Sequence, residues 1–122
     1  MRSESALQEL MEESERLWNA GDQHGWEELW RAAVPGEHVL ESPAGSKPKR
    51  GFEEARRQVW QQTQPVRITT KHLIISGSSV AALTENVVSI GDETFSIPSI
   101  DTYDFDDNGN CYERNYFALP AS

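Results

Sequence analysis

The chain has 122 residues, enough for one modest hydrophobic core, and we expect a single domain over residues 1–122. Hydrophobic residues make up 37% and charged residues 25%, which is a globular rather than a disordered composition. The formal net charge is −9, from 11 basic and 20 acidic side chains. Such a field repels phosphate groups, so we exclude nucleic acid and an anionic membrane as partners.

The compartment is inferred from what the sequence lacks. No stretch approaches the roughly 18 apolar residues that a membrane span needs. The N-terminal segment is acidic and has no apolar core of a secretory signal. Cys111 is the only cysteine, which excludes an internal disulfide and a cysteine-based zinc site. We therefore expect a cytoplasmic protein with no metal and no other cofactor.

Helical patterns occupy the first half of the chain. Apolar residues recur at helical spacing over residues 5–20. Next come Gly21, which can end a helix in the left-handed conformation, and Asp22, which can cap a second, short helix that stops at Pro35. A short strand at 38–42 and a loop at 43–51 precede a third amphipathic helix at 52–62.

The second half is rich in β-branched residues. We predict four strands joined by Gly-containing hairpin turns, at Val66–Ser76, Val80–Ile90, Thr94–Phe105 and Cys111–Leu119. Three helices followed by an antiparallel meander indicate the α+β class, with the helices on one face of the sheet. A long, strongly curved sheet of this kind can leave a cavity open at one end.

Three stretches carry a resemblance to a known superfamily: Leu17–Asp22, Leu40–Ser46 and Ile100–Phe105. With them the chain resembles, from about Ala6 to Leu119, the nuclear-transport-factor-2-like superfamily and within it the SnoaL-like and ketosteroid isomerase-like branch. The resemblance implies a cone in which three N-terminal helices pack on a strongly curved antiparallel sheet. It also implies a homodimer, and a hydrophobic pocket for a small apolar or oxygenated, ring-containing ligand.

The candidate catalytic residues follow from the same resemblance. Ketosteroid isomerases move a proton next to a carbonyl, with a carboxylate base and an oxyanion hole made of a tyrosine and a neutral aspartic acid. The resemblance places Asp101 at the oxyanion-hole acid, Ser42 at the general base and Ser14 at the tyrosine. A serine hydroxyl has no useful basicity near neutral pH without a partner base. We therefore expect no ketosteroid isomerisation.

Asp101 and Ser14 each admit two interpretations. Strand alternation places Asp101 on the same face as apolar neighbours. A bulge at Pro98 would change which of the residues before it share that face. There it is either a pocket acid that donates to a ligand oxygen or an acid paired with Arg114. Ser14 interrupts an apolar helical stripe and either points into the cavity or bonds back to the preceding turn. The candidate ligand-binding residues are Trp18, Trp60, Tyr103, Arg114 and Tyr116.

The remaining polar candidates are weaker. Glu41 is the carboxylate nearest to the position of the base, but alternation turns it to the face opposite Ser42. We expect His24 and His38 to be exposed, and His72 to be a surface or hydrogen-bonded residue rather than a catalyst.

Three functions remain open on this evidence. The first is an isomerase-, cyclase- or hydrolase-like enzyme acting on a steroid-, terpenoid- or polyketide-like molecule through Asp101. The second is a non-catalytic binding protein that kept the pocket and lost the base. The third is a protein-interaction domain that uses the open face of the sheet. The sequence favours the pocket over the third function, because an interaction surface has no need of a buried carboxyl.

Overall fold

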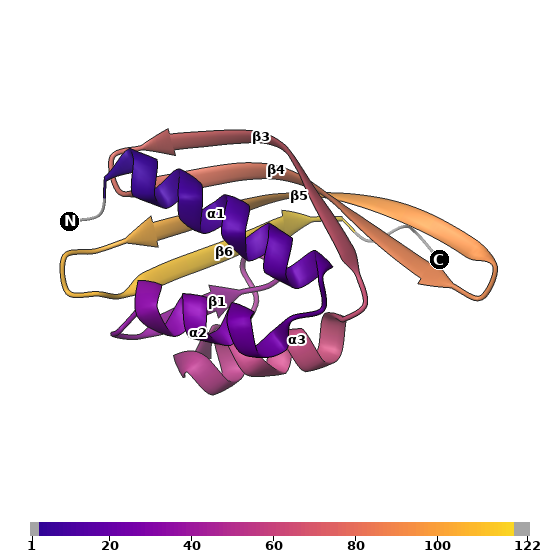
Figure 1. Ribbon diagram of the computed structural model, residues 1–122, viewed down its shortest axis with the longest axis horizontal. Coiled ribbons are helices and arrows are strands. Elements are labelled where there is room, and N and C mark those ends of the chain that lie inside the picture. Colours follow the sequence, from indigo (N-terminus) through magenta and orange to yellow (C-terminus); the bar gives the residue numbers. More distant parts are fainter. Residues whose placement is uncertain (1–2, 119–122) are drawn as a thin grey trace.

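The computed structural model describes residues 3–118, which form three helical segments and one six-stranded sheet (Figure 1). The first half contains α1 (Glu4–Asn19), α2 (Gln23–Ala33), β1 (His38–Glu41) and β2 (Lys49–Arg50), then a π-helical turn η1 (Glu53–Arg57) that continues into α3 (Gln58–Thr63). The second half contains β3 (Arg67–Ser76), β4 (Ser79–Ile90), β5 (Glu93–Phe105) and β6 (Cys111–Phe117). The predicted α+β class is confirmed.

The boundary between the first two helices forms as the sequence predicts. Gly21 has a φ of +70°, the left-handed conformation that favours glycine. Asp22 then caps α2, and its Oδ1 accepts the backbone N–H of Gly25 at 2.9 Å. Ser3 caps α1 in the same way, through the N–H of Ala6.

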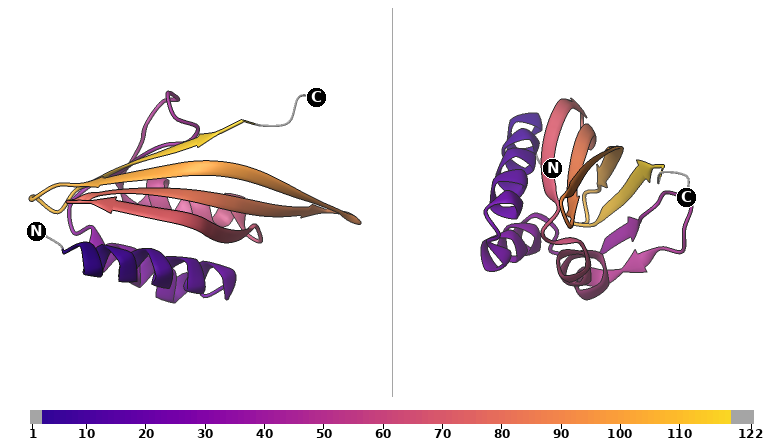
Figure 2. Two further views of the ribbon diagram at one scale, coloured as in Figure 1. Left: turned by 90° about the horizontal axis from the view of Figure 1, so that it is seen from above. Right: turned by 90° about the vertical axis from the view of Figure 1, so that its right-hand side faces the viewer.

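The sheet has the strand order β2-β1-β6-β5-β4-β3 and is mixed. The four long strands form the predicted antiparallel meander, whereas β1 pairs with β6 in parallel. The right-hand view of Figure 2 looks along the strands and shows them fanning in a curve from β3 to β2, with the helices on one side. In Figure 1 the β4–β5 hairpin projects beyond the helices.

Three details of the sheet and helices differ from the sequence predictions. The expected loop at 43–51 contains β2, which pairs with β1. β5 pairs with β4 without a register shift through Pro98, and the irregularity lies instead in β3 between Thr70 and His72. The third helix begins as the π-helical turn η1 rather than as a regular α-helix. Leu119, the expected end of the last strand, lies outside the described residues.

Helix α1 is joined to β3 by one asparagine. The side chain of Asn19 donates to the carbonyl of Ile68 at 2.7 Å and accepts the N–H of the same residue at 2.9 Å. The amide therefore forms hydrogen bonds with both backbone groups of Ile68, as a neighbouring strand would, at the edge of the sheet where β3 has no strand partner. Thr70, farther along β3, donates its N–H to the Glu15 carboxylate. These bonds hold the helix against one side of the curved sheet.

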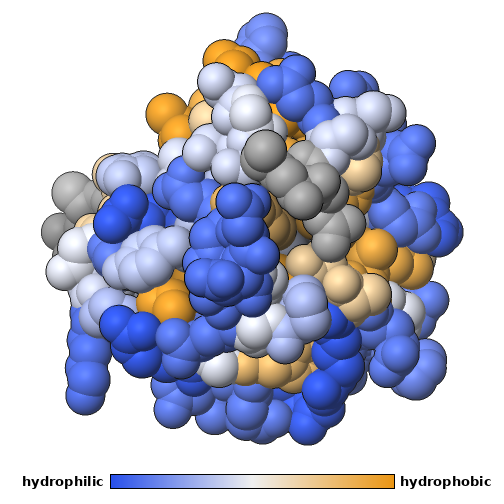
Figure 3. All heavy atoms as spheres, turned by 90° about the vertical axis from the view of Figure 1, so that its left-hand side faces the viewer, coloured by the Kyte–Doolittle hydropathy of each residue, from blue (hydrophilic) through white to orange (hydrophobic). Residues whose placement is uncertain are grey.

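The hydrophobic core is formed by the inner faces of α1, α2, α3 and the sheet. It includes all four tryptophans, each of which is buried: Trp18, Trp26, Trp30 and Trp60. The end of the molecule shown in Figure 3 is mainly hydrophilic, with small scattered apolar groups, as expected for a chain of this net charge. No helix among residues 3–118 is long and apolar enough to cross a membrane.

Candidate functional site

A cavity of about 280 Å³ opens between the inner face of the sheet and the helices. Strand alternation determines its floor, because the residues of β4, β5 and β6 that line it are every second residue of one stretch of each strand. The exposed surface of its walls is mainly apolar, as is usual for a small-molecule site, although ten of its eighteen lining residues carry polar groups. The polar lining residues are Ser14, Ser42, Arg56, Thr63, Asn86, Ser99, Asp101, Tyr103, Glu113 and Asn115.

Asp101 is held by neutral hydrogen-bond donors on the floor of the cavity. Its Oδ1 accepts from Nδ2 of Asn115 at 3.0 Å, and its Oδ2 lies 3.3 Å from the Ser99 hydroxyl. Arg114, the alternative partner suggested by the sequence, is bonded to Glu41 instead, at 3.3 Å. Asp101 lines the cavity and has no ion-pair partner among the described residues.

A second carboxylate, Glu113, lies next to Asp101 in the sheet interior. Its Oε1 accepts from Nη2 of Arg56 at 2.5 Å and lies 2.9 Å from Nε2 of His38. Its Oε2 accepts from Asn115, the same amide that bonds Asp101. Glu113, Arg56 and His38 are all at most 4% exposed, so this is a fully buried charge cluster.

The charge state of the cluster follows from these contacts. Burial alone would raise the pKa of Glu113, but the Arg56 charge and the hydrogen bonds from His38 and Asn115 outweigh it and lower the pKa to about 2. Burial, together with the charge of Arg56, lowers the pKa of His38. At neutral pH the cluster is an ionised Glu113 paired with Arg56 beside a neutral histidine.

The pKa of Asp101 is shifted in the opposite direction, upward. Burial and then the negative charge of Glu113 raise its pKa to about 7, against the opposing hydrogen bonds of Ser99, Asn115 and Thr84. Both protonation states of Asp101 are therefore populated near neutral pH. Burial also raises the pKa of Tyr103 well above its usual range, so its phenol remains a neutral donor.

Five of the eight predicted site residues line the cavity: Asp101, Ser42, Ser14, Trp18 and Tyr103. Trp60 lies behind this lining, packed against Trp18 and Trp26 in the core. Arg114 and Tyr116 are on the opposite face of β6, because alternation gives the inner face to Glu113 and Asn115. We therefore no longer place Trp60, Arg114 or Tyr116 in contact with a ligand.

The sequence analysis missed the charge cluster. His38, expected to be exposed, is 2% exposed and bonded to Glu113, so that expectation was wrong. Glu113 and Asn115 lie two and four residues after Cys111, so strand alternation puts all three on the same face of β6. This alternation was the one sequence signal that Glu113 and Asn115 face inward. Glu41 lies outside the cavity, bonded to Tyr112, Arg114 and the N–H of Gly45, in agreement with its predicted orientation. His24 and His72 are exposed.

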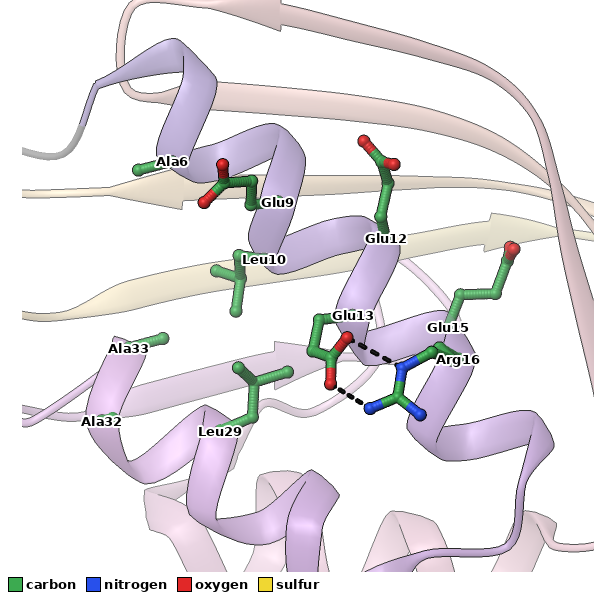
Figure 4. A pocket seen from close by; sticks show the side chains of 10 residues that line it. All are labelled: Ala6, Glu9, Leu10, Glu12, Glu13, Glu15, Arg16, Leu29, Ala32 and Ala33. Atoms are coloured by element: carbon green, nitrogen blue, oxygen red, sulfur yellow. Dashed lines mark hydrogen bonds and ion pairs between the residues drawn. The ribbon is translucent and has the colours of Figure 1, made fainter.

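A larger hollow, of about 880 Å³, lies between α1 and α2 (Figure 4). Its polar residues are mostly glutamates of α1, and Glu13 is bonded to Arg16 within the same helix. None of the carboxylates of α1 in this hollow is buried, so it has the character of a solvated helix surface. Among residues 3–118 no cluster of three or more His, Cys, Asp or Glu side chains is arranged to hold a metal ion.

The fold and cavity together define an α+β cone with an acid on the floor of an apolar chamber. Two of the solved structures that share this fold are SalBIII, an epoxide hydrolase/cyclase-like enzyme with a role in pyran ring formation in the polyether salinomycin, and an LEH-like epoxide hydrolase of M. tuberculosis. SalBIII matches with a TM-score of 0.78 and 22% identity over 98% of this chain and 95% of its own. For the M. tuberculosis enzyme the TM-score is 0.66 and the identity 19%, over 90% and 80%. No family model and no curated protein matches the sequence.

Proposed function

We propose that the protein is a metal-independent acid/base enzyme of the hydrolase or cyclase kind, which opens a cyclic ether such as an epoxide on an apolar molecule. The observation that carries this proposal is Asp101, a cavity carboxyl with a pKa of about 7. A general acid or base works best when its pKa lies near the working pH, because both protonation states are then accessible. The shared fold with an epoxide hydrolase/cyclase-like enzyme supports the choice of reaction class.

In the proposed reaction, neutral Asp101 donates its proton to the ring oxygen as the carbon–oxygen bond breaks. A nucleophilic oxygen then forms a new bond to the same carbon. Attack by water gives a diol, and attack by a hydroxyl of the same substrate gives a larger cyclic ether. In either case the proton lost by the nucleophile returns to the Asp101 carboxylate, so the enzyme ends unchanged.

Two further polar residues of the cavity, Asn86 and Ser42, have roles beside Asp101 in this reaction. The amide of Asn86 donates to Ser99 and to the carbonyl of Ile97, while its Oδ1 receives no hydrogen bond from residues 3–118. Asn86 lines the cavity with Asp101, and in the proposed reaction this oxygen accepts the O–H of the nucleophile. Ser42 lines the same cavity but has no basicity of its own, so it serves as a polar contact rather than as the base.

The test is turnover of a panel of apolar epoxides (styrene oxide, cyclohexene oxide, limonene oxide and an epoxide with a hydroxyl side chain), with products identified by mass spectrometry. We expect diol or cyclic-ether formation by the unmodified protein and its loss in Asp101→Ala. Replacement of the solvent-exposed Asp107 by Asn is the matched control, and its rate should equal that of the unmodified protein. Failure of every substrate contradicts the proposal and favours a non-catalytic binding protein. Turnover that survives Asp101→Ala contradicts the role of Asp101 in the reaction.

A further inference from the structure

The hydroxyl of Ser14 has an unusual set of partners. Its Oγ accepts from Nε1 of Trp30 at 3.0 Å and from Nε1 of Trp26 at 3.2 Å. An indole N–H can only donate, and a serine hydroxyl has two acceptor lone pairs and one proton. Both lone pairs of Ser14 are therefore occupied, and the proton is its only remaining hydrogen-bonding capacity.

That proton has no acceptor among residues 3–118. A helical serine ordinarily donates to the carbonyl one turn back, and Thr63 does this in α3 through the carbonyl of Val59. No such bond forms from Ser14, which instead lines the cavity together with Asp101 and Tyr103. The hydroxyl proton of Ser14 is therefore available to an acceptor on a ligand in the cavity.

The two indoles are fixed by their packing. Trp26 packs against Trp18 and Trp60, with ring centroids 5.3 Å apart in both pairs. Trp30 stacks on Tyr103 at 5.7 Å and an interplanar angle of 19°. The guanidinium of Arg56 lies 5.2 Å from the ring of Trp26 and 5.0 Å from that of Trp30. Because neither ring is free to turn, the two N–H groups remain on Ser14 and no rearrangement is needed when a ligand binds.

We propose that Ser14 is a fixed hydrogen-bond donor to an oxygen acceptor of the cavity ligand, held in that role by the indoles of Trp26 and Trp30. The ligand class this selects is an apolar molecule with a carbonyl, ether or epoxide oxygen. A ligand O–H or N–H proton finds no acceptor at Ser14, because both lone pairs are filled. The two indole bonds also polarise the hydroxyl and strengthen the bond it donates. The inference deepens the proposed function and rests on it only in taking the cavity to be a ligand site.

The first test compares 1-tetralone with tetralin, two rigid molecules that differ at one carbonyl oxygen. Their affinities are measured by calorimetry for the unmodified protein, Ser14→Ala and Ser14→Thr, each first confirmed as folded by circular dichroism. We expect the unmodified protein to prefer the ketone and Ser14→Ala to reduce that preference by about three- to tenfold, the value of one hydrogen bond. Ser14→Thr keeps the hydroxyl and should retain the preference. An undiminished preference in Ser14→Ala would overturn the proposal.

A second test needs no substitution in the cavity. Indole N–H resonances are observed by ¹⁵N-resolved NMR while either compound is added. When the Ser14 hydroxyl donates to the ketone, its oxygen becomes a better acceptor, so the Trp26 and Trp30 signals should move downfield with 1-tetralone and not with tetralin. Trp18 is an internal control, since it also lines the cavity but donates to the carbonyl of Val66. Identical shifts with both compounds would contradict the proposal.

The two proposals can fail separately. Neither probe contains an epoxide, so the Ser14 result does not depend on whether Asp101 catalyses ring opening. Loss of epoxide turnover in Asp101→Ala without any effect of Ser14→Ala on ketone preference would support the reaction and overturn the donor role. Absence of epoxide turnover by the unmodified protein, together with a reduced ketone preference in Ser14→Ala, would support a binding site that discriminates by oxygen acceptor and would contradict catalysis. Absence of saturable binding of both probes would overturn the donor role.

Discussion

Asp101 and Glu113 are two carboxylates joined through a single amide: Nδ2 of Asn115 lies 3.0 Å from an oxygen of each. Their protonation states nevertheless differ. Glu113 is ionised because the positive charge of Arg56 compensates its own. Asp101 has no such partner among residues 3–118, and its pKa is raised to about 7. Pairs of titratable groups whose environments separate their pKa values are a recurring way of creating an acid and an anion side by side.

The first prediction concerns the influence of Glu113 on Asp101. Glu113→Gln removes the charge that, after burial, contributes most to raising the pKa of Asp101, and it leaves the Arg56 charge in place. The pKa of Asp101 should therefore fall, as followed by the ¹³C resonance of its carboxyl through a pH titration. Glu27→Gln is the matched control, since Glu27 is another buried glutamate paired with an arginine, Arg57, at 2.9 Å. An unchanged Asp101 pKa in Glu113→Gln would show that burial alone sets it.

The second prediction is that Asp101→Asn stabilises the fold at alkaline pH. The pKa of Asp101 is about 7 in the folded chain and about 3.9 when unfolded. The folded state therefore binds more protons between these values, and the stability contributed by Asp101 decreases as the pH rises through this window. An asparagine cannot ionise and escapes this loss.

Urea unfolding at pH 4.5 and pH 8 measures the effect. The free energy of unfolding of Asp101→Asn, relative to the unmodified protein, should be higher at pH 8 than at pH 4.5 by on the order of 2–4 kcal/mol. Glu113 does not interfere, because its depressed pKa of about 2 confines its loss of stabilisation to more acidic solutions. An equal difference at both pH values would refute the raised pKa of Asp101.

The third prediction is a homodimer through the outer face of the sheet. Leu83, Ile100 and Tyr116 are register neighbours on β4, β5 and β6, and they are 39%, 48% and 48% exposed. An isologous pairing would bury this row of three side chains. Sedimentation should give twice the mass of one chain for the unmodified protein and for Ile90→Lys, at the projecting hairpin, but one chain mass for Ile100→Lys. A monomeric unmodified protein at micromolar concentration would rule the pairing out.

The sequence predicts the architecture where the determining signals are local. Gly77, Gly91 and Gly109 all have positive φ in the predicted hairpin turns, and the strands between them agree with the predicted bounds to within one residue, apart from the last strand. Alternation along β5 predicts that Asp101 and Tyr103 share one face of the strand, and both line the cavity. The parallel pairing of β1 with β6 was not predicted, because it joins segments far apart in the chain.

The charge cluster was missed for the same reason. Glu113 is 57 residues from Arg56 and 75 from His38, and no local pattern relates the three. His38 follows a Pro-Gly turn and has the sequence context of an exposed strand start. Only the parallel pairing of β1 with β6, which places His38 opposite Cys111, brings it to the interior beside Glu113. The indole contacts of Ser14 likewise depend on how α1 packs against α2.

We propose that Asp101 presents a proton to an oxygen of the bound ligand, and the pH dependence of ligand affinity tests this role. The measurement is the dissociation constant of 1-tetralone from pH 5 to pH 9 for the unmodified protein and Asp101→Asn. The unmodified protein should lose affinity by about two- to tenfold as the pH rises through about 7, because Asp101 then loses the proton that it donates. Asp101→Asn, which keeps a neutral donor, should bind independently of pH. Affinity that does not change with pH in either protein would show that Asp101 donates no proton to the ligand.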